Sequence, residues 1–267
     1  MSLVFSVAKN EIRQQTRRIA VWVGLALVAA IAAQQTIVSK DLIDYNDIGC
    51  FFGISGSIGG YIFYVVSVLC AGRLCNKKDN YFDILASTRL TTRQFYAGKV
   101  LGNVLLFCSF CFVLMLLLLP INFIKHSVVS SGFMAVPYFL IHYFFRCAMF
   151  ILISIAFLAM FDILFKNPII SSILTLMYQM VVLFTARPKL LINFFLIRNP
   201  YSPYIFLTQY FFLPVGHDQY LQQTYSFEYT YGYTTLNGFI SLFIAIAMIV
   251  IFYFVGLAVF KRRSSKA

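Results

Sequence analysis

Long apolar runs alternate with short polar stretches along most of the chain. A helix that crosses a bilayer needs about 20 predominantly apolar residues. Six runs approach or exceed this length, and they cover residues 19–38, 50–71, 100–123, 134–161, 169–186 and 236–260. We therefore predict an all-α polytopic membrane protein, with six transmembrane helices in a single domain over residues 1–267.

Breaks in this pattern suggest where the helices end. Pro120 is expected to break the third helix, because proline lacks a backbone N–H. Asp162 to Pro168 is predicted to be a tight turn. The segment 187–235 is rich in Tyr and Phe and interrupted by prolines, which favours short re-entrant or interfacial helices over a seventh span. An aromatic belt that anchors an outer loop explains the same pattern.

The first 18 residues mix apolar positions with regularly spaced bases. Lys9, Arg13 and Arg17 recur every four residues, and the pattern is interrupted by Glu11 and Gln15. This spacing predicts a basic amphipathic helix over residues 1–18. Such a helix lies in the cytoplasmic interface of a membrane, where anionic lipids attract it.

A charged island over residues 73–99 separates the second and third apolar runs. Thr91 and Gln94 have the spacing of a capping box, with Leu90 and Phe95 as the flanking apolar pair, so a helix is expected to begin at about Thr92. Just before it, Tyr81, Phe82, Ile84, Leu85 and Thr88 form one face of a helix too short to span a bilayer. An ordinary basic loop with a capped helix is the alternative.

The island resembles the cytosolic loop of ABC-2 type exporter permeases, E-x-x-x-G-T-x-E-L-L-L-S-T-P-x-S-R-x-x-x-x-G-K. Asp83 matches the second Glu, and Gly98 with Lys99 matches the final pair; Asn80 and Arg89 replace the usual Gly and Pro. The resemblance implies a coupling helix that sits in a groove of a separate ATPase. The residues expected to contact it are Asn80, Tyr81, Phe82, Asp83, Ile84, Leu85, Ser87, Thr88 and Arg89. The resemblance also implies that residues 1–18 form an elbow helix that touches the ATPase, with Lys9, Arg13 and Arg17 at its interface, and that residues 187–235 form an outer re-entrant hairpin before the last span.

Composition and charge agree with a membrane location. The chain is 61% hydrophobic and 11% charged, with a formal net charge of +12. Nucleic-acid binding would gather the bases on one soluble face, but here they flank apolar runs. If both termini are cytoplasmic, 15 of the 21 Lys and Arg residues lie inside, as the positive-inside rule favours.

Catalytic and metal-binding patterns are weak in this sequence. Gly53-Ile54-Ser55-Gly56 is similar to the motif of rhomboid intramembrane proteases, but His142 lacks the small neighbours that a close Ser–His pair needs. Gly53, Gly56 and Gly60 are better explained as a surface for close helix packing. Cys108 and Cys111 lie mid-span without a second pair, the histidines lack metal-ligand spacing, and no nucleotide-binding motif is present.

Polar side chains inside the apolar runs are further candidates. Arg146 in the fourth run is either a contact for an anionic substrate or a partner in a structural pair. Gln179 is a second possible pathway residue. Gln179 and Asn103 are more typical of hydrogen bonds between helices than of ligand binding.

The resemblance implies the permease subunit of an ATP-driven exporter. The bias toward Phe, Ile and Tyr indicates a bacterial inner membrane. The expected substrate is an amphiphilic peptide, lipid or drug-like molecule. The chain itself would be no enzyme and hold no cofactor, since ATP and Mg would bind to two copies of an ATPase subunit. A second permease copy or paralogue would complete the pathway, among membrane lipids. The alternatives are a membrane module that recruits or regulates an ATPase, and an intramembrane serine protease.

Overall fold

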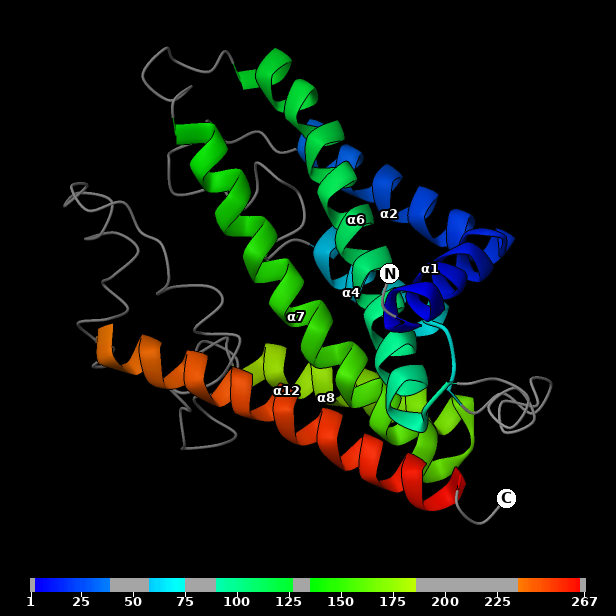
Figure 1. Cartoon of the computed structure of the whole chain (residues 1–267). Coiled ribbons are helices and arrows are strands. Elements are labelled where there is room, and N and C mark those ends of the chain that lie inside the picture. Colours follow the sequence, from blue (N-terminus) through cyan, green and yellow to red (C-terminus); the bar gives the residue numbers. More distant parts are fainter. Residues whose placement is uncertain (1–2, 39–57, 75–89, 127–134, 186–234, 265–267) are drawn as a thin grey trace.

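The computed structural model describes residues 3–38, 58–74, 90–126, 135–185 and 235–264. Within these ranges the chain is all-helical and contains no strand. Figure 1 shows long helices that cross one another in a bundle, with the first helix folded back against it. The helices are α1 (Leu3–Thr16), α2 (Ile19–Val38), α4 (Ile58–Cys70), α6 (Thr92–His126), α7 (Ala135–Phe165), α8 (Pro168–Thr185) and α12 (Thr235–Ser264).

Each of the six predicted spans overlaps a helix, and of the second span, 50–71, the structure describes only α4 as helical. α2 has the predicted bounds, and α8 differs from its prediction by one residue at each end. Three helices contain a segment long and apolar enough to cross a membrane, or four if α1 and α2, which are bent by 74°, count as one broken span. The described residues are therefore those of a membrane protein, while the number of six spans stays a prediction.

Two predicted helix ends are wrong. α6 continues through Pro120 to His126. In an apolar run no water competes for the backbone, so the surrounding helix persists around a single missing N–H. Asp162 belongs to α7, which ends only at Phe165. Its carboxylate is buried in contacts with other elements, and the turn between α7 and α8 is therefore shorter than predicted.

The main apolar core lies between α2, α4, α6 and α7. Phe63, Phe107 and Ile151 are fully buried there. α7, α8 and α12 meet through aromatic rings: Phe157 stacks on Tyr178 at a centroid distance of 4.3 Å and meets Phe252 edge-on at 4.7 Å. These contacts bring the last helix into the same bundle as the rest.

A second apolar cluster forms where α6 begins and α12 ends. It contains Leu74, Phe95, Tyr96, Ala159, Ile163, Leu257 and Phe260. The hydroxyl groups of Thr92 and Ser264 lie 3.3 Å apart, so the end of α12 is beside the start of α6. Val7 of α1 packs against the same cluster. Parts of α1, α6, α7 and α12 therefore contribute to one cluster, which also includes Leu74 and contacts Leu90, the described residues on either side of the segment 75–89.

Candidate functional site

The predicted ATPase-contacting residues 80–89 lie outside the described residues. The structure does describe the chain on both sides of them, at Ala71–Leu74 before the segment 75–89 and from Leu90 after it. These two flanks show how the segment is attached to the bundle, and they form the candidate site.

The downstream flank confirms the predicted capping box. The Thr91 N–H donates to Oε1 of Gln94 at 3.0 Å, and the Gln94 N–H donates to Oγ1 of Thr91 at 3.3 Å. Leu90 packs against the second apolar cluster, which includes Phe95. The reciprocal bonds satisfy two N–H groups that would otherwise lack partners at the start of α6. The segment 75–89 is therefore followed by a well-defined helix start.

The upstream flank is held by side chains from other helices, beginning with Asn103 of α6. Its Oδ1 accepts the Gly72 N–H at 2.6 Å, and its Nδ2 lies 3.3 Å from the Gly72 carbonyl oxygen. The same amide donates to the Lys99 carbonyl at 3.0 Å. The sequence predicted a hydrogen bond between helices for Asn103; its partner is instead the backbone just after α4, where it fixes both backbone groups of one residue.

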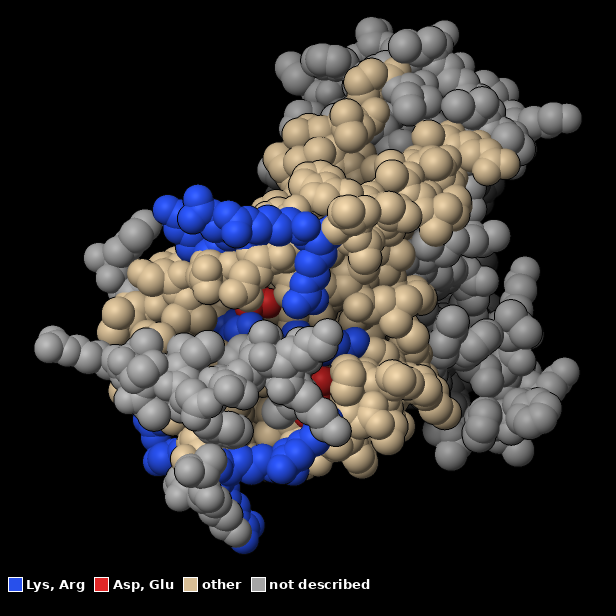
Figure 2. Space-filling view, turned by 90° about the vertical axis from the view of Figure 1, so that its right-hand side faces the viewer, with Lys and Arg blue, Asp and Glu red and all other residues tan. Residues whose placement is uncertain are grey.

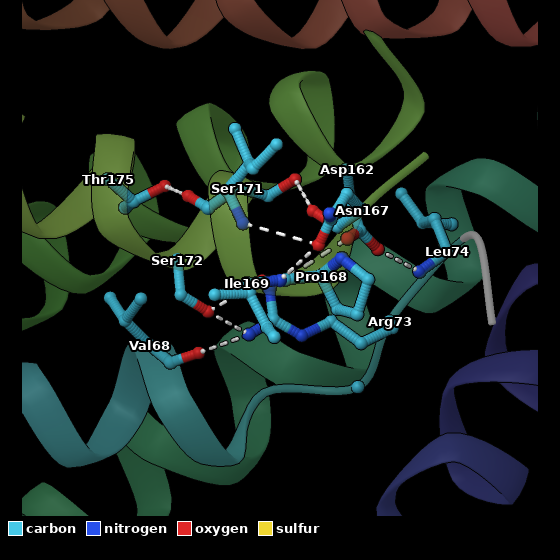
Figure 3. A network of polar contacts seen from close by, with 12 residues as sticks. Val68, Arg73, Leu74, Asp162, Asn167, Pro168, Ile169, Ser171, Ser172 and Thr175 are labelled. Atoms are coloured by element: carbon cyan, nitrogen blue, oxygen red, sulfur yellow. Dashed lines mark hydrogen bonds and ion pairs between the residues drawn. The ribbon is translucent and has the colours of Figure 1, made fainter. Parts of the chain in front are cut away.

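The next two residues are held by Asp162 of α7 (Figure 3). Its Oδ2 accepts the Leu74 N–H at 2.6 Å, and its Oδ1 lies 3.8 Å from Nη1 of Arg73. The Arg73 guanidinium also donates to the hydroxyl of Ser172 in α8 and to the Val68 carbonyl. Burial lowers the pKa of Arg73 below its ordinary value, and the Asp162 carboxylate opposes this. An arginine pKa is so high that Arg73 stays charged.

A second buried ion pair joins α1 to α6. Nζ of Lys99 lies 2.6 Å from Oε2 of Glu11, and the other oxygen of Glu11 accepts a 2.7 Å hydrogen bond from Nε2 of Gln15. Glu11 and Gln15 are each 1% exposed. Both lie directly against Gly72, where an added Cβ would overlap Oε1 of Glu11 and Nε2 of Gln15. Only a glycine fits at this point without displacing them.

We call these six side chains, Glu11, Gln15, Arg73, Lys99, Asn103 and Asp162, the polar clamp. Glu11 and Asp162 are the only acidic residues in the described ranges, and both belong to it. Burying an ion pair often costs as much in desolvation as the attraction returns, so its net contribution to stability is small. The geometry of a buried ion pair is specific, however, because separating the two partners leaves a buried charge without its counter-charge. The clamp therefore fixes where the segment 75–89 starts.

Local sequence explains how α7 and α8 reach the clamp. Lys166 has a φ of 54°, the left-handed conformation typical of a residue just after a helix. Oδ1 of Asn167 then accepts the N–H groups of Ile169 and Ile170 at 3.0 and 3.4 Å, with Pro168 at the first helical position. This sharp reversal brings the first turn of α8 beside Arg73.

α12 contacts the clamp region through its last turn. The guanidinium of Arg263 donates to the carbonyl oxygens of Ile163 and Leu164, the latter at 3.1 Å. These carbonyls belong to the last turn of α7, where helical partners are lacking. A cation there also complements the helix dipole. The end of α7 that carries Asp162 is thus tied to α12.

Two glycines let α1 approach α6. An added Cβ at Gly98 would lie 2.5 Å from Cβ of Val7, and one at Gly102 would lie 2.9 Å from the Ala8 carbonyl oxygen. Gly98 and Gly102 are one helical turn apart, the spacing of a close-packing motif. The sequence reasoning missed this pair, although Gly98-x-x-x-Gly102 was a readable signal. It also treated Glu11 and Gln15 as interruptions, whereas they form the buried face of α1.

The remaining predicted residues have mixed outcomes. Lys9 and Arg13 of α1 are exposed, as is Arg17 just after it, and their role at an interface stays a prediction. Nε2 of Gln179 donates to the hydroxyl of Ser154 at 2.8 Å, an interhelical bond, and Gln179 is 2% exposed. Gly53, Ser55 and Gly56 lie outside the described residues. Of His142 and Arg146 only the backbone, in α7, is described, and Gly60 is described only as part of α4.

Two comparisons with known sequences found no relative. A scan against models of protein families gave no match, and a search of curated protein sequences found no significant similarity. Among the described residues, no group of three or more His, Cys, Asp or Glu side chains could hold a metal ion. The site is thus defined by its own geometry, a polar clamp and a capped helix start on either side of the segment 75–89.

Proposed function

We propose that this chain is the permease subunit of an ATP-driven ABC exporter, and that the segment 75–89 contains its coupling helix. The observation that carries the proposal is the attachment of this segment. Leu74 is bonded to Asp162, Thr91 caps α6, and Leu74 and Leu90 pack in one apolar cluster. A loop fixed at both ends to several long helices can pass a mechanical displacement to them. Residues 80–99 resemble the coupling loop of ABC-2 permeases, and this resemblance indicates an ATPase as the source of that displacement.

In this proposal the ATPase pushes on residues 80–88 when it closes on ATP. Tyr81, Phe82, Ile84 and Leu85 fill an apolar groove, and Asp83 meets a basic group there. The displacement reaches α6 through Thr91, and it reaches α7, α8 and α1 through the polar clamp. Two copies of the chain, or this chain and a paralogue, enclose the pathway. ATP and Mg bind to the two ATPase subunits, so this chain carries no catalytic residue.

We propose an amphiphilic substrate, a peptide, a lipid or a drug-like molecule, that leaves the cytoplasm or the inner leaflet of a bacterial inner membrane. The apolar and aromatic character of the bundle favours this class. Both acidic residues of the described part are engaged in the clamp, so neither is available to a cationic substrate there. We further propose that both termini and the segment 75–89 lie in the cytoplasm. The proximity of Thr92 to Ser264, and of Val7 to the second apolar cluster, supports a location on one side of the membrane.

The test is co-purification of an ATPase with the tagged chain from its native membrane in mild detergent. Two double variants are compared with the wild type. Asp83→Lys with Leu85→Asp alters the coupling segment, and Leu42→Asp with Asp44→Lys makes the same two changes in a predicted outer loop. We expect an ATPase with Walker motifs to accompany the wild type and the outer-loop variant but not the first variant. An ATPase that is absent from all three, or equally retained by all three, contradicts the proposal.

A further inference from the structure

α1 has two faces of opposite character. Ala8, Glu11 and Gln15 are buried against α6 and Gly72. Lys9 and Arg13 are exposed, and at 100° per residue they project from the side opposite Glu11. Arg17 is also exposed, just after the helix. The helix that holds the polar clamp on one side therefore presents a row of cations on the other.

No acidic residue of the described ranges neutralises this row. The two acids there, Glu11 and Asp162, are buried in the clamp. Figure 2 shows Lys and Arg side chains gathered over one end of the molecule, with only small areas of Asp or Glu visible between them. Arg18, Arg93 and Lys261 add exposed cations among the described residues. Such a surface attracts an anionic partner.

The corner between α1 and α2 places the row at the membrane surface. α2 contains no charged residue, and its first two turns expose the apolar side chains of Ile19 and Val23. Trp22 is 52% exposed, and its Nε1 donates to the Thr16 carbonyl at 2.6 Å. A tryptophan with an apolar ring and a polar end is typical of the membrane–water interface. Since α1 turns away from α2 by 74°, it runs along that interface when α2 crosses the bilayer.

We propose that α1 is a lipid-responsive arm: anionic phospholipid headgroups bind Lys9, Arg13 and Arg17 and thereby hold the polar clamp closed on Gly72. The headgroups draw the outer face of α1 to the bilayer, and the helix then keeps Glu11 and Gln15 against Gly72 and within reach of Lys99. In a membrane without anionic lipid, α1 is held by its protein contacts alone. The start of the segment 75–89 is then less firmly fixed. This inference does not depend on an ATPase or on transport.

Two backbone amides report directly on the clamp. The Gly72 N–H is bonded to Asn103, and the Leu74 N–H is bonded to Asp162. Their hydrogen exchange is measured with the purified full chain in nanodiscs of phosphatidylcholine alone and with phosphatidylglycerol added. The Gln94 amide, which belongs to the local capping box, serves as an internal control. We expect exchange at Gly72 and Leu74 to slow severalfold in the anionic nanodiscs, with little change at Gln94.

Matched variants identify the cations responsible. Lys9→Gln, Arg13→Gln and Arg17→Gln together remove three charges from the arm, and Lys261→Gln, Arg262→Gln and Lys266→Gln remove three from the C-terminal end. A basic residue near an anionic surface strengthens binding by roughly fivefold. We therefore expect the first variant to lose the effect of phosphatidylglycerol and the second to keep it.

Three results overturn the proposal. Exchange at Gly72 and Leu74 that is the same in both lipids shows that the clamp does not respond to headgroups. An equal loss in the two triple variants shows a general charge effect. If the arm variant loses a bound protein in both lipid compositions, and exchange does not depend on phosphatidylglycerol, the cations bind a protein and not the headgroups. None of these results bears on whether an ATPase docks on residues 80–88.

Discussion

The segment 75–89 is attached to the bundle by two flanks that are built differently. At Gly72 to Leu74 the backbone is held by side chains of α6 and α7, and Glu11 of α1 lies against it. At Leu90 to Phe95 the contacts are a local capping box and an apolar cluster. A polar attachment depends on a few directional contacts between buried groups, so losing one partner is costly. A local cap contributes less to stability, and its loss leaves the contacts of other helices in place. The upstream flank should therefore be far more sensitive to single substitutions.

The largest effect is expected for Asp162→Ala. The change removes the acceptor of the Leu74 N–H and leaves the Arg73 guanidinium in the interior without its carboxylate. Breaking a buried pair in this way costs about 3–5 kcal/mol of unfolding free energy. Thermal unfolding of the detergent-purified chain, followed by size-exclusion chromatography, measures the loss. The double variant Asp162→Leu with Arg73→Met should recover much of it, and a double variant as unstable as Asp162→Ala would contradict this account of the pair.

A somewhat smaller loss is expected for Lys99→Met. Glu11 then keeps a hydrogen bond from Gln15 but loses its cation. We expect a cost of about 3 kcal/mol, at the lower end for a broken buried pair. The matched control is Arg93→Met, which removes an exposed cation from the same helix and should change stability by about 0.5 kcal/mol or less. Equal effects of the two substitutions in the same unfolding assay would show that the Glu11–Lys99 pair is not specific.

Gly72→Ala tests the close contact between the upstream flank and α1. The new methyl group overlaps the side chains of Glu11 and Gln15, so one of them must move. Overpacking of this kind costs about 1–3 kcal/mol. At Gly24 a methyl group would lie 2.8 Å from Cγ1 of Val66, a milder overlap than the one at Gly72, and Gly24→Ala should therefore cost less. The order of the two melting temperatures decides the point: a lower value for Gly24→Ala would mean that Gly72 does not need to be glycine.

The smallest effect is expected at the downstream flank. Thr91→Ala removes the acceptor of the Gln94 N–H and one half of the capping box. Loss of an N-cap side chain costs about 1 kcal/mol. Thr91→Ser keeps the hydroxyl oxygen and should behave as the wild type in the same assay. If Thr91→Ala destabilises the chain as much as Asp162→Ala does, the two flanks are not different in kind.

The same contrast explains how much the sequence could predict. The capping box joins residues three positions apart, and apolar runs of helical length mark the spans, so the start of α6 and the positions of six helices were readable. The Leu74–Asp162 contact joins residues 88 positions apart. Nothing local to Asp162 shows that its carboxylate is buried, and it was therefore assigned to a turn. Pro120 does not end α6 as predicted, because the apolar surroundings of a long helix outweigh the low helix propensity of one residue.

The candidate site was predicted in its position but not in its construction. The sequence marked the charged island as the candidate site. Its contacts with an ATPase stay a prediction, because residues 75–89 lie outside the described part. The sequence did not predict that Glu11 and Gln15 face inward. On a helix with a basic outer face an acid looks like an interruption, and only the approach of α1 to Gly98 and Gly102 shows that Glu11 is opposite Lys99.

The central claim is that residues 80–88 dock on an ATPase, and site-specific photo-crosslinking in the native membrane tests it most directly. A photoreactive amino acid replaces Leu85 in one strain and Leu117, an exposed apolar residue of α6, in another. The proposal predicts that position 85 crosslinks to a polypeptide with Walker motifs and that position 117 does not. If position 85 gives no such product while the full-length chain is present in the membrane, the claim is contradicted.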